Sequence, residues 1–312
     1  SISEKIGRIT ATSSLEAKPH LRRNNKIKSI HSSLKIEANS LTLGQVRDVI
    51  NGKVVLGEQK EIQEVKNAYA AYERLSEIDP YDMRYLKRFH GMMTKYLVEE
   101  SGEFRSGEEG VFNGDQCIFM APPARLVPQL MHELFAWMKE ARADVHPLIL
   151  SSVFHYEFVF IHPFSDGNGR MARLWHTAIL SKWKPVFEYI PIESQIEQFQ
   201  DEYYEAIYIM PPIAAGVFFT SFSNLYSDIA VYYKKTKYVM YPAIIAAVSN
   251  LILNYIFINL YGYMAAAYTT LFSYILFALF QGIWSRKICK EHGMKKGTIF
   301  NDKFMIVLAI IT

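Results

Sequence analysis

The sequence has few cysteines and no strong excess of charge. Its 312 residues include two cysteines, Cys117 and Cys289, at a spacing that fits no metal or redox motif. This usage argues against a disulfide framework and fits a reducing compartment. The net charge of +3 is too close to balance to indicate a nucleic-acid partner. Residues 1–35 are polar and basic and contain no apolar run of the kind found in a signal peptide.

Charged residues are missing mainly from the C-terminal third. Ala206–Ser227 and Tyr238–Ser285 contain no Asp, Glu, Lys or Arg, whereas the preceding residues are rich in them. The mean hydropathy of +0.01 is therefore an average of a polar part and an apolar part. We predict one domain over 1–206, which includes an N-terminal helix, and a transmembrane-like helical segment over 207–312.

Helical periodicity dominates the polar part, which predicts a mostly α fold. Helix-start signals such as Asp79-Pro80 and His146-Pro147 help to place the helices. The expected helices are 41–51, 58–78, 82–99, 125–143, 146–160, 169–183 and 195–208. The aromatic residues expected in the core are Phe154, Phe158, Phe160, Tyr69, Tyr72 and Tyr85, and the histidines expected to be structural are His90 and His155.

The most informative segment is residues 162–173, which read HPFSDGNGRMAR. The run Asp166–Gly169 favours turns, and the residues from Arg170 to Leu180 favour a helix. The segment therefore predicts a loop that leads into a helix N-terminus, where free backbone N–H groups favour an anion. Arg170 and Arg173 are three positions apart, so both can face that anion from one side of the helix.

Taken singly, these residues have ordinary structural explanations. His162 would be a structural histidine, Asp166–Gly169 a plain turn, and the two arginines part of a solvated helix face. In this order and spacing they instead predict a site for a di- or triphosphate. The site would have a carboxylate for Mg²⁺ and a histidine beside the reacting phosphorus.

The segment resembles the motif of the Fic family, His-Pro-Phe-x-Asp-Gly-Asn-Gly-Arg-x-x-Arg, at every defining position. The resemblance implies a Fic-type helical bundle with a small β-hairpin flap. It also implies a nucleotidyltransferase that moves AMP from ATP to a Ser, Thr or Tyr hydroxyl of a target protein (AMPylation), with Mg²⁺ as the metal. Modification of the chain itself would follow from the same chemistry.

The resemblance assigns roles to individual residues. His162 would be the catalytic base, Asp166 would hold Mg²⁺, and Arg173 would bind the γ-phosphate. The other residues that it implies in nucleotide binding are Phe164 as the anchor of the loop, Gly167, Asn168, Gly169 and Arg170 at the phosphates, and Tyr203 and Tyr204 at the adenine.

A segment that starts at Ser33, SLKIEAN, resembles the inhibitory motif of Fic proteins, Ser/Thr-x-x-x-Glu followed by Gly or Asn. Ala38 stands in the usual glycine place and Asn39 follows it. The resemblance implies that Glu37 forms an ion pair with Arg173 and holds ATP in an unproductive pose. In some family members this glutamate also helps to remove AMP, so de-AMPylation is a second role for Glu37. The alternative is an ordinary acidic residue on an amphipathic helix.

Val111–Met120 has an Asn-Gly turn between two apolar runs, which predicts a β-hairpin. In the Fic family a hairpin flap near this place aligns the target backbone by strand addition. The resemblance therefore places the target protein at residues 111–122, and Arg105 also fits the family context. A generic surface hairpin is the alternative.

The apolar part contains two runs, Tyr238–Ile258 and Tyr263–Trp284, that are each long enough to cross a bilayer. We expect a tight turn over Asn259–Gly262 between them and a third segment that begins near Lys303. Residues 208–312 resemble part of a polysaccharide flippase of the MATE-like superfamily, and the alternative is a pair of buried helices. The basic residues on both flanks, which indicate the cytoplasmic side, are Lys234, Lys235, Lys237, Arg286 and Lys287.

This topology conflicts with the predicted chemistry. If Ala206–Ser227 also spans, residues 1–205 lie outside the cell, where ATP is not available. Either this run does not span or the chain joins two unrelated reading frames, and we favour a fusion. A cytoplasmic Fic domain, anchored in the inner membrane if the C-terminal helices insert, is the expected location. Pro211-Pro212 is expected to interrupt the helix near Tyr203, which puts the adenine site in question.

Two other functions stay open at this point. The chain could be a flippase fragment whose helices dominate its behaviour, or that fragment fused to an inactive Fic-like interaction module. Dependence of solubility on detergent would favour the first. Nucleotide binding without transfer, even after Glu37→Gly, would favour the second.

Overall fold

The computed structural model describes residues 19–113 and 116–293. The chain divides into two compact units, Ser1–Gln200 and Asp201–Thr312. The expected domain boundary at residue 206 lies inside a helix that starts at Gln200, so the domain limits stay a prediction.

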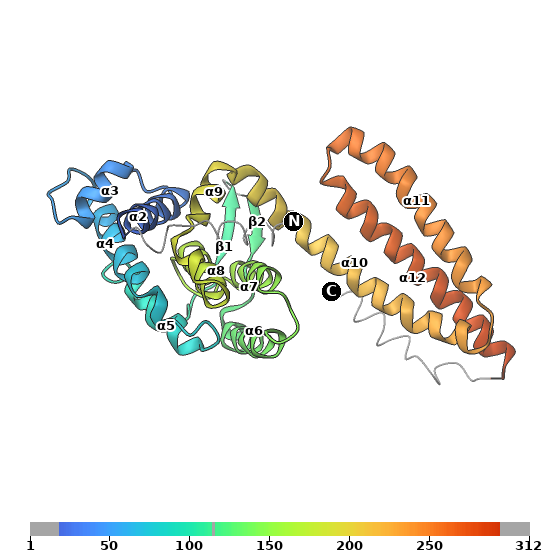
Figure 1. The fold of residues 1–312 in the computed structure, drawn as a ribbon. Coiled ribbons are helices and arrows are strands. Elements are labelled where there is room, and N and C mark those ends of the chain that lie inside the picture. The colour runs from blue at the N-terminus through green and yellow to red at the C-terminus, as the bar shows by residue number, and fades with distance from the viewer. Residues whose placement is uncertain (1–18, 114–115, 294–312) are drawn as a thin grey trace. The chain divides into compact units, whose positions relative to one another are not determined.

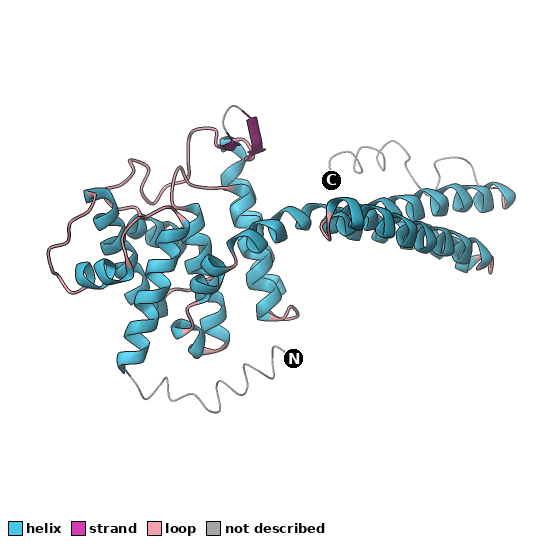
Figure 2. Ribbon diagram, turned by 90° about the horizontal axis from the view of Figure 1, so that it is seen from above, coloured by secondary structure: helices cyan, strands magenta, loops and turns pink. Residues whose placement is uncertain are grey.

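The described part of the first unit is helical apart from one hairpin, which confirms the prediction of a mostly α fold (Figure 1). Figure 2, coloured by secondary structure, shows the two strands as the only arrows among its described elements. The elements are α2 (Pro19–Ile36), α3 (Leu43–Ile50), α4 (Gln59–Glu73), η1 (Leu75–Glu77), α5 (Met83–Met93), β1 (Gly110–Asn113), β2 (Gln116–Met120), η2 (Ala124–Leu126), α6 (Val127–Ala141), α7 (Pro147–Ile161), α8 (Asn168–Trp183), η3 (Pro185–Tyr189) and α9 (Ile192–Gln198).

Helix α8 forms the centre of the first unit. Its residues Met171, Leu174 and Trp175 are fully buried, and α7 packs along it with Phe154 and Phe158. The Trp175 indole N–H donates to the carbonyl oxygen of Pro80, 3.0 Å away, so its one polar atom is satisfied in the core. This packing gives the loop before α8 a rigid support.

One aromatic residue predicted in the core lies outside it. Phe160 is 42% exposed. It stands two positions from the buried Phe158 on the same helix, and residues two apart point in different directions. Phe160 therefore cannot face the core together with Phe154 and Phe158.

The predicted hairpin is present. β1 and β2 pair antiparallel, with Gly110 opposite Met120 and Asn113 opposite Gln116. The register shifts between Val111 and Phe112, which marks a β-bulge. In the chain, the hairpin precedes α6, and α7 then leads to the motif loop.

Three helix predictions were wrong. The helix expected over 58–78 ends at Glu73, and the short η1 follows it. The helix expected over 82–99 ends at Met93, and Tyr96 then takes a left-handed φ of 65°. The helix expected over 195–208 is divided at Phe199 into α9 and α10 (Gln200–Tyr232). The expected interruption at Pro211-Pro212 was also wrong, because α10 continues through both prolines. It does so although each proline removes a backbone hydrogen bond and its ring crowds the carbonyl of the preceding turn.

The second unit consists, in its described part, of α10, α11 (Lys237–Tyr261) and α12 (Ala265–Glu291). All three are long and apolar enough to cross a membrane. α11 and α12 lie side by side (Figure 1). The turn between them falls at Gly262, where φ is 77°, so the expected turn residues Asn259–Tyr261 belong to α11 instead. The segment expected near Lys303 lies outside the described residues.

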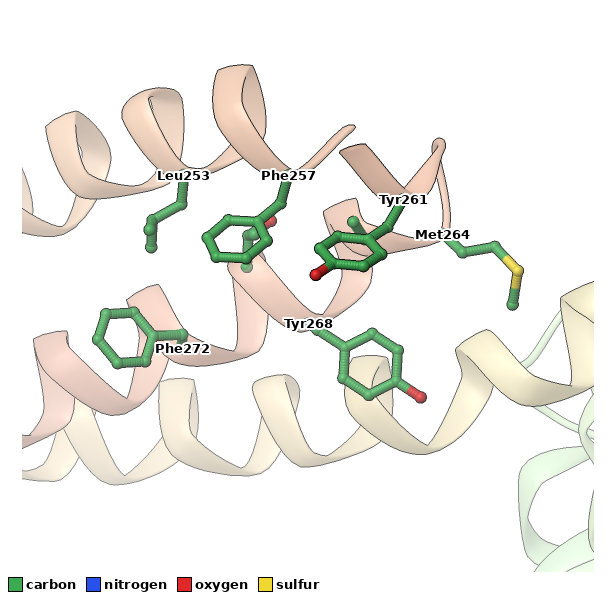
Figure 3. Close-up of a pocket in the computed structure, with 8 residues that line it drawn as sticks. Leu253, Phe257, Tyr261, Met264, Tyr268 and Phe272 are labelled. Atoms are coloured by element: carbon green, nitrogen blue, oxygen red, sulfur yellow. The ribbon is translucent and has the colours of Figure 1, made fainter. Parts of the chain in front are cut away.

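The contact between α11 and α12 has a polar part and an aromatic part. Asn250 donates to the hydroxyl of Thr270, and Thr269 donates to Asn254, so two polar contacts join the helices inside an apolar surface. Nearer the turn, aromatic rings from both helices line a cavity of about 500 Å³ (Figure 3). The rings belong to Phe257, Tyr261, Tyr268 and Phe272.

Two histidines in the core of the first unit make its stability depend on pH. The rings of His155 on α7 and His176 on α8 lie 5.7 Å apart. Burial lowers the pKa of His155 from 6.5 to about 3 and that of His176 from 6.5 to about 4. The native state holds both neutral, whereas the unfolded chain takes up protons below about pH 6.5. Stability is therefore full above that pH and is lost as the pH falls towards 4.

We expect the free energy of unfolding to fall by about 2 kcal/mol per buried histidine between pH 7 and pH 5. His176→Gln should remove one of these contributions and flatten the dependence, as measured by denaturant unfolding of the full chain in detergent. His132→Gln, at an exposed helix position, is the matched control. An unchanged pH slope in the His176 variant would contradict the burial of a neutral imidazole.

Candidate active site

The loop from His162 to Gly167 joins α7 to α8 through two left-handed residues. His162 ends α7 with φ 50°, and Gly167 precedes the first residue of α8 with φ 81°. A Cβ atom on Gly167 would lie 3.0 Å from the side chain of Thr94, so glycine fits both the conformation and the space. As the sequence predicted, the loop leads directly into a helix N-terminus.

The loop is held from the inside by Phe164. Its side chain is fully buried, and its ring stacks on that of His90 with centroids 3.6 Å apart and an angle of 4°. Asn168 closes the loop, because its Oδ1 accepts from the Phe164 N–H and its Nδ2 donates to the Phe164 carbonyl. Both polar atoms of the Asn168 side chain are therefore hydrogen-bonded within the loop, and the residue can offer a ligand its backbone N–H.

His90 supports the loop as a neutral group. Its Nδ1 accepts from the Gly102 N–H at 2.9 Å, which assigns the proton to Nε2, and Nε2 lies 3.0 Å from the Asp166 carbonyl oxygen. Burial lowers the pKa of His90 from 6.5 to about 4. The structural role predicted for this histidine agrees with these contacts.

His162 has the environment that a general base needs. Its Nδ1 lies 3.3 Å from the carbonyl oxygen of Val159, which favours the proton on Nδ1. Nε2 then carries a lone pair, which has no hydrogen-bond partner among the described residues. Burial lowers its pKa from 6.5, so the ring is neutral near pH 7. A neutral imidazole with a free nitrogen can accept a proton from a hydroxyl group.

Arg105 connects this loop to the base of the hairpin. The side chain is 3% exposed. Its Nε donates to the His162 carbonyl at 2.7 Å, and its terminal nitrogens donate to the carbonyls of Gly107 and Pro122 at 2.7 and 2.5 Å. The Arg105 guanidinium thus holds the backbone of His162, the predicted catalytic base, to the segments before and after the hairpin.

Arg170 has buried donors that would suit an anion. Its side chain is 3% exposed, and one terminal nitrogen donates to Asp166 at 2.8 Å. Its Nε and its other terminal nitrogen have no hydrogen-bond partner in the described structure, although Glu64 lies 3.5 Å from the latter. Buried guanidinium donors of this kind are costly without an acceptor, and phosphate oxygens would supply one.

Asp166 faces the same place. Burial alone would raise the pKa of its carboxyl, but the charge and hydrogen bond of Arg170 and the N–H of Gly167 outweigh it and lower the pKa. The carboxylate is therefore ionised at neutral pH, and its side chain is 37% exposed. One carboxylate beside a phosphate site is a common protein contribution to Mg²⁺, which takes its other ligands from phosphates and water. The residues present thus fit the predicted metal.

The second arginine is engaged by the predicted inhibitory segment. Arg173 donates to Glu37 Oε1 at 2.7 Å, to the Ser33 hydroxyl at 3.0 Å and to the Ser33 carbonyl at 2.9 Å. A Cβ atom added at Gly169 would lie 2.2 Å from the same Glu37 oxygen. The Glu37 carboxylate therefore lies against the start of α8, where the helix favours an anion.

The end of α2 brings Glu37 to this position. Ala38 takes a left-handed φ of 66°, and the Asn39 N–H donates back to the Leu34 carbonyl, as in a Schellman motif. Asn39 then donates to Glu64 at 2.8 Å. Sequence analysis missed Glu64, which approaches Arg170 from α4, because an acidic residue on an amphipathic helix carries no local signal.

Two predicted parts of the site are left open by the geometry. Tyr203 and Tyr204 lie in the second unit, with their rings 5.3 Å apart, and their place at an adenine stays a prediction. The docking of a target protein at residues 111–122 also stays a prediction.

Comparison with known proteins agrees with the motif. Residues 80–180 match the family model of the Fic/DOC family, which places a Fic/DOC domain over the motif loop and the hairpin. The chain is 28% identical over 192 residues to the protein adenylyltransferase Fic of Aedes aegypti, covering 59% of this chain and 36% of that protein. It is 30% identical over 196 residues to the protein of the same name from Drosophila virilis, covering 58% of this chain and 38% of that one.

A solved structure gives the same fold. The crystal structure of a Fic family protein from Desulfovibrio desulfuricans matches with a TM-score of 0.63 and 48% sequence identity, over 67% of this chain and 63% of that one. This likeness confirms the Fic-type fold predicted for the first part of the chain. The chain spans less than two fifths of the length of the two curated relatives.

We expect Arg105→Lys to destabilise the first unit by about 2 kcal/mol, because a lysine cannot reproduce the several hydrogen bonds that this buried guanidinium donates to backbone carbonyls. Arg84→Lys is the matched control, since the Arg84 side chain is 89% exposed and pairs with Asp82 at the surface. Thermal unfolding of both variants in detergent compares them. Equal, small shifts in Tm for the two would contradict the role given to Arg105.

Proposed function

We propose that the first unit is a protein adenylyltransferase, which moves AMP from ATP to a Ser, Thr or Tyr hydroxyl of a target protein. The observation that carries the proposal is the site of residues 162–173, where an anion position at the start of α8 adjoins buried, unsatisfied donors of Arg170. The names of the similar proteins from Aedes aegypti and Drosophila virilis point to the same reaction.

In the proposed reaction, the hydroxyl oxygen of the target attacks the α-phosphorus of ATP. The bond from that phosphorus to the oxygen that bridges it to the β-phosphorus breaks, and pyrophosphate leaves. His162 Nε2 accepts the proton of the hydroxyl group. Asp166 would hold Mg²⁺, which neutralises charge on the phosphates. Arg170 and the N–H groups of Asn168 and Gly169 would orient them, because the Gly167 N–H is already donated to Asp166.

We propose that Glu37 holds this enzyme in an inhibited state. Its carboxylate takes the anion position against Gly169 and the guanidinium of Arg173. ATP with its γ-phosphate at Arg173 would compete with that carboxylate for both contacts. The side chain of Glu37 is 34% exposed, so it can move away without opening the core. Its proximity to the nucleotide also suits the reverse reaction, removal of AMP.

The test is incubation of the full chain in detergent with α-labelled ATP and Mg²⁺. Glu37→Gly should increase the label that the protein transfers to itself, because the competing carboxylate is gone. Adding His162→Ala should reduce it about 10²–10⁴-fold, whereas His132→Ala, at an exposed position, should not. Label that persists without His162 would exclude this base, and no label in any variant would exclude the transferase.

We propose further that α11 and α12 anchor the protein in the inner membrane. Large apolar side chains near the middle of α11 face outward, such as Leu251 at 70% and Tyr255 at 77% exposure. The basic residues that flank the pair lie at the start of α11 and near the end of α12, which is the same end of the pair. This arrangement favours two spans with both ends in the cytoplasm. A cytoplasmic first unit needs α10 to stay out of the bilayer core. The flippase resemblance of 208–312 remains an alternative reading of these helices.

Single cysteines test this topology. Two variants are made in a Cys117→Ser background. The first keeps native Cys289 as its one cysteine. In the second, Cys289 is replaced as well and Tyr96→Cys is added, at a position of the first unit that is 81% exposed. With two spans, a membrane-impermeant maleimide should label both from the cytoplasmic side of membrane vesicles. Labelling of the two cysteines from opposite sides would mean that α10 also spans, and a protein that washes from the vesicles would exclude the anchor.

A further inference from the structure

A second carboxylate reaches the phosphate site from the N-terminal helices. Glu64 lies on α4, and its side chain is 12% exposed. Its Oε1 lies 3.5 Å from a terminal nitrogen of Arg170, and its Oε2 accepts a hydrogen bond from the Asn39 side chain at 2.8 Å. One carboxylate thus contacts both a predicted phosphate-binding arginine and the end of the inhibitory segment.

The contact of Glu64 with Arg170 is an ion pair that lacks a hydrogen bond. The terminal nitrogen that faces Glu64 has no hydrogen-bond partner in the described structure, so its donor stays available to a ligand. A phosphate oxygen bound there would lie near the Glu64 carboxylate. Because both side chains are largely shielded from water, the two anions would be weakly screened and would repel each other. Glu64 therefore opposes a phosphate at Arg170.

The contact with Asn39 holds this carboxylate in place. Asn39 is 6% exposed, and its own side chain is fixed. Its Oδ1 accepts from the Leu41 N–H at 3.1 Å, and its Nδ2 also lies 3.3 Å from the Glu61 carbonyl oxygen. A fixed donor at Oε2 restricts the rotation of the Glu64 carboxylate, so Oε1 stays directed at Arg170. The last residue of the inhibitory motif thus orients Glu64.

We propose that Glu64 is a second inhibitory carboxylate, which lowers the affinity of the site for a polyphosphate at Arg170, as Glu37 does at Arg173. This inference deepens the proposed function and rests on it for the identity of the polyphosphate as ATP. Glu37 is 34% exposed and can leave, whereas Glu64 is 12% exposed and stays beside Arg170. Glu37→Gly therefore removes only part of the inhibition.

The first measurement is the affinity of the Glu37→Gly chain for ATP with Mg²⁺, by calorimetry of the full chain in detergent. Adding Glu64→Gln should tighten binding about tenfold, because glutamine keeps an acceptor for Asn39 and removes the competing charge. Glu73→Gln is the matched control, since Glu73 lies at the other end of the same helix and pairs with Lys26. Weaker or unchanged binding after Glu64→Gln would overturn the proposal, because a carboxylate that only holds Arg170 in place would give that result.

The second measurement separates the charge of Glu64 from its orientation. Asn39→Ala in the Glu37→Gly chain frees the Glu64 carboxylate, so it should tighten ATP binding, although less than Glu64→Gln does. Once Glu64→Gln is present, Asn39→Ala should change the affinity little, because no charge is left to orient. No gain from Asn39→Ala, or a gain that persists at full size in the Glu64→Gln chain, would overturn the link between the two residues.

Inorganic tripolyphosphate, which carries no nucleoside, separates this proposal from the proposed function. If it binds more tightly after Glu64→Gln while ATP binds no variant, the role of Glu64 stands and the adenylyltransferase fails. If ATP binds but Glu64→Gln tightens neither ligand, the role of Glu64 fails and the proposed function is untouched. If neither ligand binds any variant, both fail, since Arg170 then takes no phosphate.

Discussion

The ion pair between Arg173 and Glu37 organises the first unit. Arg173 is 4% exposed and comes from the central helix α8, so removing its partner would leave a nearly buried charge uncompensated. Meeting this charge requires α2 to end at the mouth of the site, which the left-handed Ala38 achieves. The N-terminal helix is therefore fixed by the electrostatic demand of the site rather than by apolar packing alone.

The same demand explains why one place serves both inhibition and binding. A glycine-containing loop before a helix, with Gly169 in the first turn, presents backbone N–H groups that favour an anion. In this structure the anion is the protein's own carboxylate. Arg170 beside it keeps buried donors that have no hydrogen-bond partner in the described structure, although Asp166 and Glu64 compensate its charge. A polyphosphate would satisfy both arginines at once, and this is the physical basis on which a nucleotide could displace Glu37.

Local sequence patterns predicted what depends on local chemistry. The loop, the helix that follows it and the hairpin follow from motifs whose residues lie close together in the chain. The approach of Glu37 to Arg173, 136 positions away, was instead implied by the resemblance to the Fic inhibitory motif. Contacts between distant helices were missed, namely Glu64 beside Arg170 and Glu193 beneath Tyr72, because a buried acid and a surface acid look alike in one sequence. The uninterrupted α10 was missed because proline weakens a helix without always ending it.

The central claim is that Glu37 and ATP compete for one anion position. The most direct test is calorimetric titration of the full chain and of Glu37→Gln with ATP and Mg²⁺ in detergent. Glutamine keeps the size of the side chain and removes its charge, so the substitution isolates the electrostatic competition. We predict at least tenfold tighter ATP binding by the variant, which corresponds to about 1.4 kcal/mol. Equal affinity of the two proteins for ATP would contradict the account.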